Sequence, residues 1–92
     1  MKSVDYRKLT PKQRWETREA YIIEQDGFCM YCKAKLRLPP SEDVQKMSVD
    51  KSRFPRGFFD YPIHLQHNHK TGMTEGAVHA YCNAVLWQYH NR

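Results

Sequence analysis

The chain has 92 residues, 40% of them hydrophobic, and its 15 Lys and Arg against 10 Asp and Glu give a formal net charge of +5. This length predicts one domain with a small core, and the sequence shows neither a closed disulfide set among its three cysteines, nor a membrane span, nor the apolar core of a signal peptide. We therefore expect a cytoplasmic protein with reduced cysteines, whose basic charge favours a polyanionic partner and no membrane.

The first predicted element is a helix over about residues 11–26. Thr10 and Gln13 have the spacing of a capping box, and Gly27 offers the left-handed conformation in which many helices end. Helical spacing predicts a buried stripe that begins at Trp15. The other face of this helix is basic, which indicates either a solvated surface or contact with phosphate, and it carries Lys12, Arg14 and Arg18.

A Cys-x-x-Cys knuckle at residues 29–32 follows, and residues 37–61 are then the least regular part of the sequence. Pro39 and Pro40 interrupt the chain, and Ser41 is a suitable start for a short helix. Basic and aromatic residues are mixed further on. This mixture fits contact with nucleic acid and equally fits an irregular loop anchored to the core, and its members are Lys51, Arg53, Phe54, Arg56, Phe58 and Phe59.

Residues 62–80 predict a β-hairpin, because apolar and polar residues alternate from Ile63 to His67 and a Lys-Thr-Gly turn at 70–72 precedes a second strand. Residues 82–90 predict a final helix, with apolar residues at helical spacing. The order of helix, knuckle, irregular insert, hairpin and helix predicts an α+β domain.

The three cysteines and one histidine form two pairs with the same spacing. Two residues separate Cys29 from Cys32, and two residues separate His79 from Cys82. Together the pairs offer the four thiolate and imidazole ligands that zinc prefers. The alternatives are a redox cysteine pair, a buried apolar cysteine and a surface histidine, but the matched spacing favours a structural zinc ion. Such an ion would join the two halves of the chain and contribute folding energy.

Three histidines lie within six residues, at His64, His67 and His69. This density favours a second metal site or general-base chemistry, with a solvated polar hairpin as the alternative. Asn83 follows Cys82 on the first turn of the final helix, from where its side chain can point at the strand that carries His67. A strand histidine and a helix asparagine over one hairpin are typical of a one-metal nuclease site.

With these motifs in this order, residues 28–90 resemble the HNH, or ββα-metal, endonuclease superfamily. The likeness is greatest to the phage recombination endonuclease VII group and to related small phage homing endonucleases. Three segments carry the resemblance: Cys-Met-Tyr-Cys at 29–32, His-Leu-Gln-His-Asn-His-Lys-Thr-Gly at 64–72, and Glu-Gly-Ala-Val-His-Ala-Tyr-Cys-Asn-Ala at 75–84.

The resemblance implies one domain over residues 1–92, in which a ββα-metal (His-Me finger) core at about 62–91 joins a structural zinc knuckle and an N-terminal helix. It implies the following roles: His67 as general base, His69 as a phosphate contact, Gln66 and Asn83 as ligands of a catalytic Mg²⁺ or Mn²⁺, and Cys29, Cys32, His79 and Cys82 as ligands of structural zinc. Duplex DNA is the implied partner of a monomer or loose homodimer. Its backbone would be contacted by Lys12, Arg14, Arg18, Lys51, Arg53, Arg56 and Lys70.

Gln66 departs from the family's pattern, which normally has an aspartate or a histidine at this position. A neutral amide is a poorer Mg²⁺ ligand than a carboxylate, so we expect a protein that is weakened, naturally inactive or deliberately substituted. The first hypothesis is a divalent-metal-dependent DNA endonuclease of homing type, which the end of the chain at Arg92 favours over a Holliday-junction resolvase with long additional helices. The other hypotheses are a non-catalytic, zinc-stabilised DNA-binding module and a zinc-stabilised protein-interaction domain.

Overall fold

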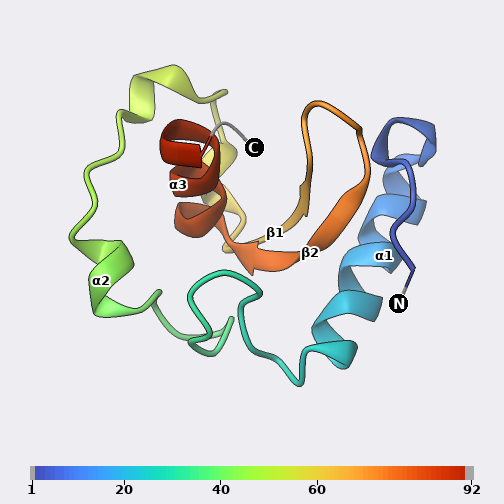
Figure 1. The fold of residues 1–92 in the computed structure, drawn as a ribbon, viewed down its shortest axis with the longest axis horizontal. Helices are drawn as coiled ribbons and strands as arrows, with labels where there is room; N and C mark the ends of the chain where they lie inside the picture. Colours follow the sequence, from blue (N-terminus) through green and yellow to red (C-terminus); the bar gives the residue numbers. More distant parts are fainter. Residues whose placement is uncertain (1, 91–92) are drawn as a thin grey trace.

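A two-stranded antiparallel hairpin lies between two helices in the computed structural model, which describes residues 2–90 (Figure 1). Residues 1, 91 and 92, at the ends of the expected domain and core, lie outside the described residues. In chain order the elements are η1 (Tyr6–Lys8), α1 (Pro11–Glu24), α2 (Glu42–Gln45), η2 (Lys51–Arg53), η3 (Phe58–Asp60), β1 (Ile63–His67), β2 (Thr74–His79) and α3 (Ala80–His90). Within the described part of the chain, no helix combines the length and apolar character needed to cross a membrane.

The predicted N-terminal helix is confirmed, but it turns a different face to the core. The capping box is present, since Thr10 Oγ1 accepts from the Gln13 backbone N–H at 3.1 Å and Gln13 Oε1 accepts from the Thr10 N–H at 2.9 Å. The prediction that Trp15 is buried is wrong, because its side chain is 56% exposed. The buried residues of α1 are Thr17 and Tyr21.

Polar anchors explain this rotation of α1. The Tyr21 hydroxyl lies 3.0 Å from Thr74 Oγ1 on β2, and the Gln25 side-chain amide pairs with the backbone of Ala77 in both directions at 2.9 Å. Hydrogen bonds between buried groups are costly to lose, so they hold the polar face of α1 against the sheet. The indole of Trp15 is thereby left on the solvent side.

An N-terminal segment that the sequence did not assign to any element runs beside the start of β2. The backbone N–H of Thr74 donates to Val4 at 2.8 Å, and the N–H of Tyr6 donates to Gly72 at 2.8 Å. Gly72 closes the hairpin turn with a φ of +79°, and the Asn68 carboxamide accepts two backbone N–H groups within the turn. This pairing carries Tyr6 to the turn end of the hairpin, beside His67.

The core lies where the hairpin meets α3 and the knuckle. Its buried members are Tyr21, Cys29, Leu36, Val44, Ala77, Val78, Cys82, Val85 and Leu86. Helix α3 begins at Ala80, directly after β2 and two residues before the predicted start. His79 and Cys82 therefore stand at the junction of β2 and α3.

The insert at residues 37–61 is more ordered than the sequence suggested, since it contains α2, η2 and η3. Its aromatic side chains pack against one another and against α3, with ring centroids 5.4 Å apart for Phe54 and Trp87 and 4.9 Å apart for Phe54 and Phe58. Gln88 on α3 also accepts from the backbone N–H of Asp50 at 3.0 Å. These contacts anchor the insert to α3.

Candidate metal centre and histidine pocket

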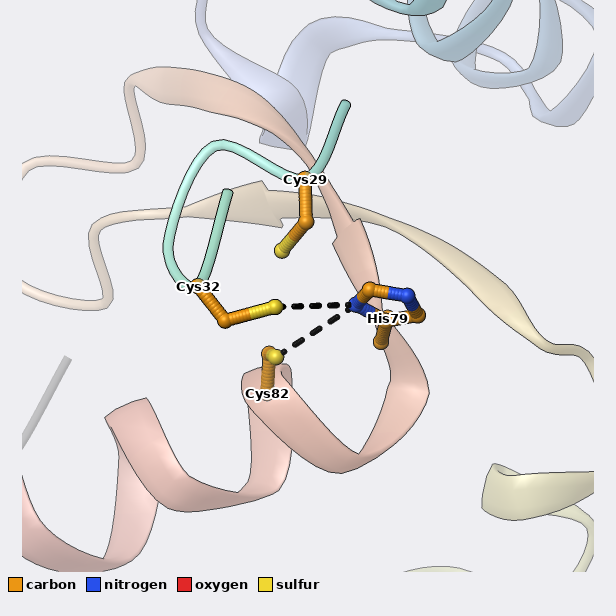
Figure 2. A group of neighbouring side chains, drawn as sticks. All are labelled: Cys29, Cys32, His79 and Cys82. Atoms are coloured by element: carbon orange, nitrogen blue, oxygen red, sulfur yellow. Dashed lines mark hydrogen bonds between the residues drawn. The ribbon is translucent and has the colours of Figure 1, made fainter. Parts of the chain in front are cut away.

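One cluster of side chains brings together the two pairs with matched spacing. The ligand atoms of Cys29, Cys32, His79 and Cys82 all lie within 4.8 Å of one another, and no other such group of His, Cys, Asp and Glu occurs within residues 2–90 (Figure 2). The knuckle supplies two sulfurs from a tight turn in which Lys33 has a φ of +69°. The end of β2 supplies the imidazole, and the first turn of α3 supplies the third sulfur. The cluster can hold a metal ion such as zinc.

The orientation of His79 suits a metal ligand. Its Nε2 lies 2.9 Å from the carbonyl oxygen of Lys35 and 2.8 Å from that of Leu38, and because carbonyls only accept, Nε2 carries the proton. Nδ1 then carries a free lone pair and lies 3.5 Å from Cys32 Sγ and 3.6 Å from Cys82 Sγ (Figure 2). Metal-binding histidines typically donate their second ring N–H to an oxygen acceptor in this way.

Charge in the cluster also favours a cation. A hydrogen bond from Cys82 lowers the pKa of Cys29 to about 4, assisted by backbone N–H groups such as that of Tyr31, which lies 3.4 Å from Cys29 Sγ. The same hydrogen bond, together with burial and the neighbouring sulfurs, raises the pKa of Cys82. The thiolate of Cys29 is thus stabilised, whereas ionisation of Cys82 is disfavoured. A bound dication removes this opposition, because it deprotonates the thiols that coordinate it.

A second group of polar side chains lines a pocket of about 640 Å³ between α1 and β1, which we call the histidine pocket. It brings together three of the predicted site residues, His67, His69 and Asn83, with two of the predicted basic residues, Arg14 and Arg18. The remaining lining residues are Tyr6, Pro11, Trp15, Phe58, Tyr61, Ile63, His64 and Leu65.

His67 is held against the N-terminal segment. Its ring stacks on Tyr6 with centroids 3.9 Å apart and an interplanar angle of 9°, and the Arg14 guanidinium lies 4.0 Å from the centre of the Tyr6 ring. Burial lowers the pKa of His67, and the charges of His69 and Arg14 lower it further, against partial opposition from Glu75. His67 is therefore neutral at physiological pH, the form in which an imidazole can accept a proton.

The structure pairs His64 with Asn83, a contact that we did not predict. The sequence analysis named His64 only as a member of the histidine cluster. His64 Nε2 donates to the carbonyl oxygen of Phe58 at 2.8 Å, so Nδ1 accepts from the Asn83 amide nitrogen at 3.1 Å. Burial lowers the pKa of His64, which keeps the ring neutral and this pairing intact. The Asn83 carbonyl oxygen is thus left for another partner. The sequence signals for His64 were its place in the cluster of three histidines and its alternation with Gln66, which places both on one face of β1.

Gln66 does not line the histidine pocket. Its side chain is 0% exposed, opposite Gly76 on β2, and neither Oε1 nor Nε2 has a hydrogen-bond partner among the described residues. Leaving a buried amide unpaired costs about 1–3 kcal/mol for each polar group. The structure therefore separates Gln66 from the pocket wall that carries His67, although the sequence placed both residues in one site.

The predicted basic residues divide into three locations. Arg14 and Arg18 line the histidine pocket, and Arg53 lines an adjoining pocket of about 350 Å³ together with His69, Asn83 and Trp87. Four other members line neither pocket and are exposed: Lys12, Lys51, Arg56 and Lys70.

Comparison of the chain with protein-family models, curated proteins and solved structures found no match. The chemistry of the cysteine–histidine cluster and of the histidine pocket is therefore what indicates a function.

Proposed function

We propose that this protein is a divalent-metal-dependent DNA endonuclease of HNH (ββα-metal) homing type, which binds duplex DNA and carries structural zinc at the cysteine–histidine cluster. The observation that supports it best is the histidine pocket, where the neutral His67 lies beside His69, Asn83 and two arginines. A neutral imidazole next to cationic side chains can both activate water and hold a phosphodiester.

His67 acts as the general base in this proposal. It removes a proton from water at an imidazole nitrogen, the water oxygen attacks phosphorus, and the bond to the leaving oxygen breaks. Tyr6 holds the ring in place through the 3.9 Å stack, which reduces the orientations that His67 can adopt. His69, Arg14 and Arg18 position the phosphate.

A catalytic Mg²⁺ or Mn²⁺ would be held by the side-chain oxygen of Asn83 in the histidine pocket, and Gln66, the other ligand that the resemblance implies, would have to turn its buried side chain towards this pocket to join it. The unpartnered Oε1 of Gln66 fits an oxygen ligand, and His64 holds Asn83 by its nitrogen so that its oxygen remains free to coordinate. When bound, such an ion stabilises negative charge on the phosphate and the leaving oxygen. No carboxylate lines the described part of the pocket, so binding of the ion is weak.

Nicking of supercoiled plasmid in Mg²⁺ or Mn²⁺ tests this proposal. We expect His67→Ala to lower the nicking rate by about 10²- to 10⁴-fold, the usual contribution of a general base. His90→Ala is the matched control, because His90 is an exposed histidine at the end of α3 and lies outside the histidine pocket. Equal nicking by the wild type and His67→Ala contradicts the assignment of the base.

A non-catalytic DNA-binding module is the second candidate. The burial of Gln66 favours this candidate, because a catalytic metal site without this ligand would be lost and the protein would then bind DNA without cutting it. This candidate predicts salt-dependent binding of DNA, since phosphate contacts release counterions, without nicking in either Mg²⁺ or Mn²⁺.

A further inference from the structure

Two large aromatic side chains are exposed at the edge of the histidine pocket. Trp15 on α1 is 56% exposed, and Tyr61, in the loop before β1, is 69% exposed. Both line the same pocket as His67 and Asn83. Large rings of this kind stabilise a fold when buried, and they are enriched where a protein meets a partner. Their exposure beside a polar site therefore indicates a partner that covers them.

Two ordered arginines accompany the exposed rings, of which Arg18 also lies 3.7 Å from a carboxylate oxygen of Glu19. Arg18 donates from Nη1 to the carbonyl oxygen of Ile63 at 3.1 Å, which holds its guanidinium against β1. Arg14 donates from Nε to the carbonyl oxygen of Tyr6 at 3.3 Å and lies over the ring of the same residue. The pocket thus combines ordered cations with aromatic faces.

We propose that this pocket binds a single-stranded segment of DNA, with unpaired bases stacked on Trp15 and Tyr61 and phosphates held by Arg14 and Arg18. Aromatic faces next to a basic groove are the means by which proteins bind single strands without reading sequence. Bases inside a duplex are covered on both faces by their neighbours, so only unpaired bases can use these rings. The inference rests on the proposed function in one respect, that the bound strand leads to His67.

The size and charge of the pocket favour this occupant over others. A volume of about 640 Å³ exceeds what one phosphate group fills and lies in the range of roughly 300–1,000 Å³ typical of small-ligand sites, so it can admit a nucleotide. A second copy of this chain carries the same net charge of +5 and would bring like charges towards Arg14 and Arg18.

The test measures binding by the zinc-loaded full chain, without Mg²⁺ or Mn²⁺, to a labelled oligothymidylate of about 12 nucleotides and to a blunt-ended duplex of two fully complementary strands. Fluorescence anisotropy gives both affinities. We expect Trp15→Ala to weaken oligothymidylate binding by about 5- to 100-fold, the loss of one base–aromatic stack, and Trp15→Phe to retain most of it. Duplex affinity changes less than about twofold, because paired bases do not reach the ring. Tyr61→Ala follows the same pattern.

Ile23→Ala is the control, because Ile23 is on the same helix, is 78% exposed and lies outside the histidine pocket. Circular dichroism verifies that each variant folds. A second measurement needs no change at Trp15. In Trp87→Phe, Trp15 is the remaining one of the two tryptophans, and oligothymidylate quenches its fluorescence while the duplex does not.

Three results overturn the inference: equal losses for both DNAs in Trp15→Ala, no loss for either, or a change in sedimentation with oligothymidylate affinity unchanged, which assigns this face to a second copy. The failures of the two proposals are distinguishable. Trp15-dependent binding without plasmid nicking refutes only the endonuclease. His67-dependent nicking without Trp15-dependent binding of oligothymidylate refutes only the single-strand site.

Discussion

The cysteine–histidine cluster lies at one end of the hairpin, whereas the histidine pocket runs along β1 to the turn, and the two sites are built differently. At the closed end, where Ile63 pairs with His79, four ligand atoms converge within 4.8 Å and two carbonyl oxygens fix the imidazole. At the turn, which we call the open end, His67 is half-buried and His69 is exposed beside the histidine pocket. Structural metal sites are closed and catalytic sites keep open positions. The same two strands therefore present one end suited to stability and another suited to a substrate.

The largest expected effect comes from breaking the closed end. We expect His79→Ala to lose stoichiometric zinc and cooperative thermal unfolding, because metal binding energy in small domains is folding energy and is as large as a typical stability of about 5–15 kcal/mol. Zinc analysis and circular dichroism measure both. His69→Ala is the control and retains zinc, because His69 is an exposed histidine near the hairpin turn and does not belong to the cluster. A wild-type protein that is folded and contains no zinc would contradict this role of the cluster.

The next effect tests whether Gln66 is a metal ligand or only a buried side chain without a hydrogen-bond partner. Gln66→Leu removes two buried polar atoms that lack partners, so we expect the free energy of unfolding to rise by about 2–6 kcal/mol, or 1–3 kcal/mol for each atom, while metal-dependent nicking is lost. Gln66→Asp has the opposite effect: it raises nicking, and it lowers stability in the absence of Mn²⁺ because a buried carboxylate is costly. Denaturant unfolding and plasmid nicking measure the two properties.

Gln45→Leu on α2 is the control for Gln66→Leu, because Gln45 is exposed and a change there leaves the hairpin intact. Unchanged nicking in both Gln66 variants would remove Gln66 from the metal site. A loss of stability in Gln66→Leu would show that the amide has a partner in solution.

The ligands of the cysteine–histidine cluster could be predicted from residue spacing alone. The histidine pocket was harder to predict, because its lining depends on tertiary contacts. The spacing of Cys29 and Cys32, and of His79 and Cys82, follows from ligand geometry, and the structure confirms a cluster able to hold a metal ion. The rotation that exposes Trp15 could not be predicted, because it depends on hydrogen bonds from α1 to β2 residues that lie more than fifty positions away.

Tertiary contacts also decide the surroundings of His67, the proposed base, and of Gln66, the predicted metal ligand. Strand alternation places Gln66 and His67 on opposite faces, but the sequence does not say which face is sealed. The structure buries the side chain of Gln66, which is 0% exposed, next to an irregularity in strand pairing between Gln66 and His67. Tyr6 reaches His67 only because residues 4–6 pair with the start of β2, and no hydrophobic pattern signals that pairing.

The smallest effect sharpens the role of the N-terminal segment at the open end. Burial lowers the pKa of His67, and the Tyr6 ring supplies part of that burial. In Tyr6→Ala, His67 gains contact with water and its pKa rises towards the ordinary value of 6.5. A general base acts only when unprotonated, so activity is present above its pKa and is lost as the pH falls through it. The acidic limb of the nicking profile therefore moves to higher pH in Tyr6→Ala, with less than about a twofold loss at pH 7, where a base of pKa 6.5 is still mostly unprotonated, whereas Tyr6→Phe keeps the stacked ring and the wild-type profile. A uniform loss at every pH would instead assign Tyr6 to DNA binding.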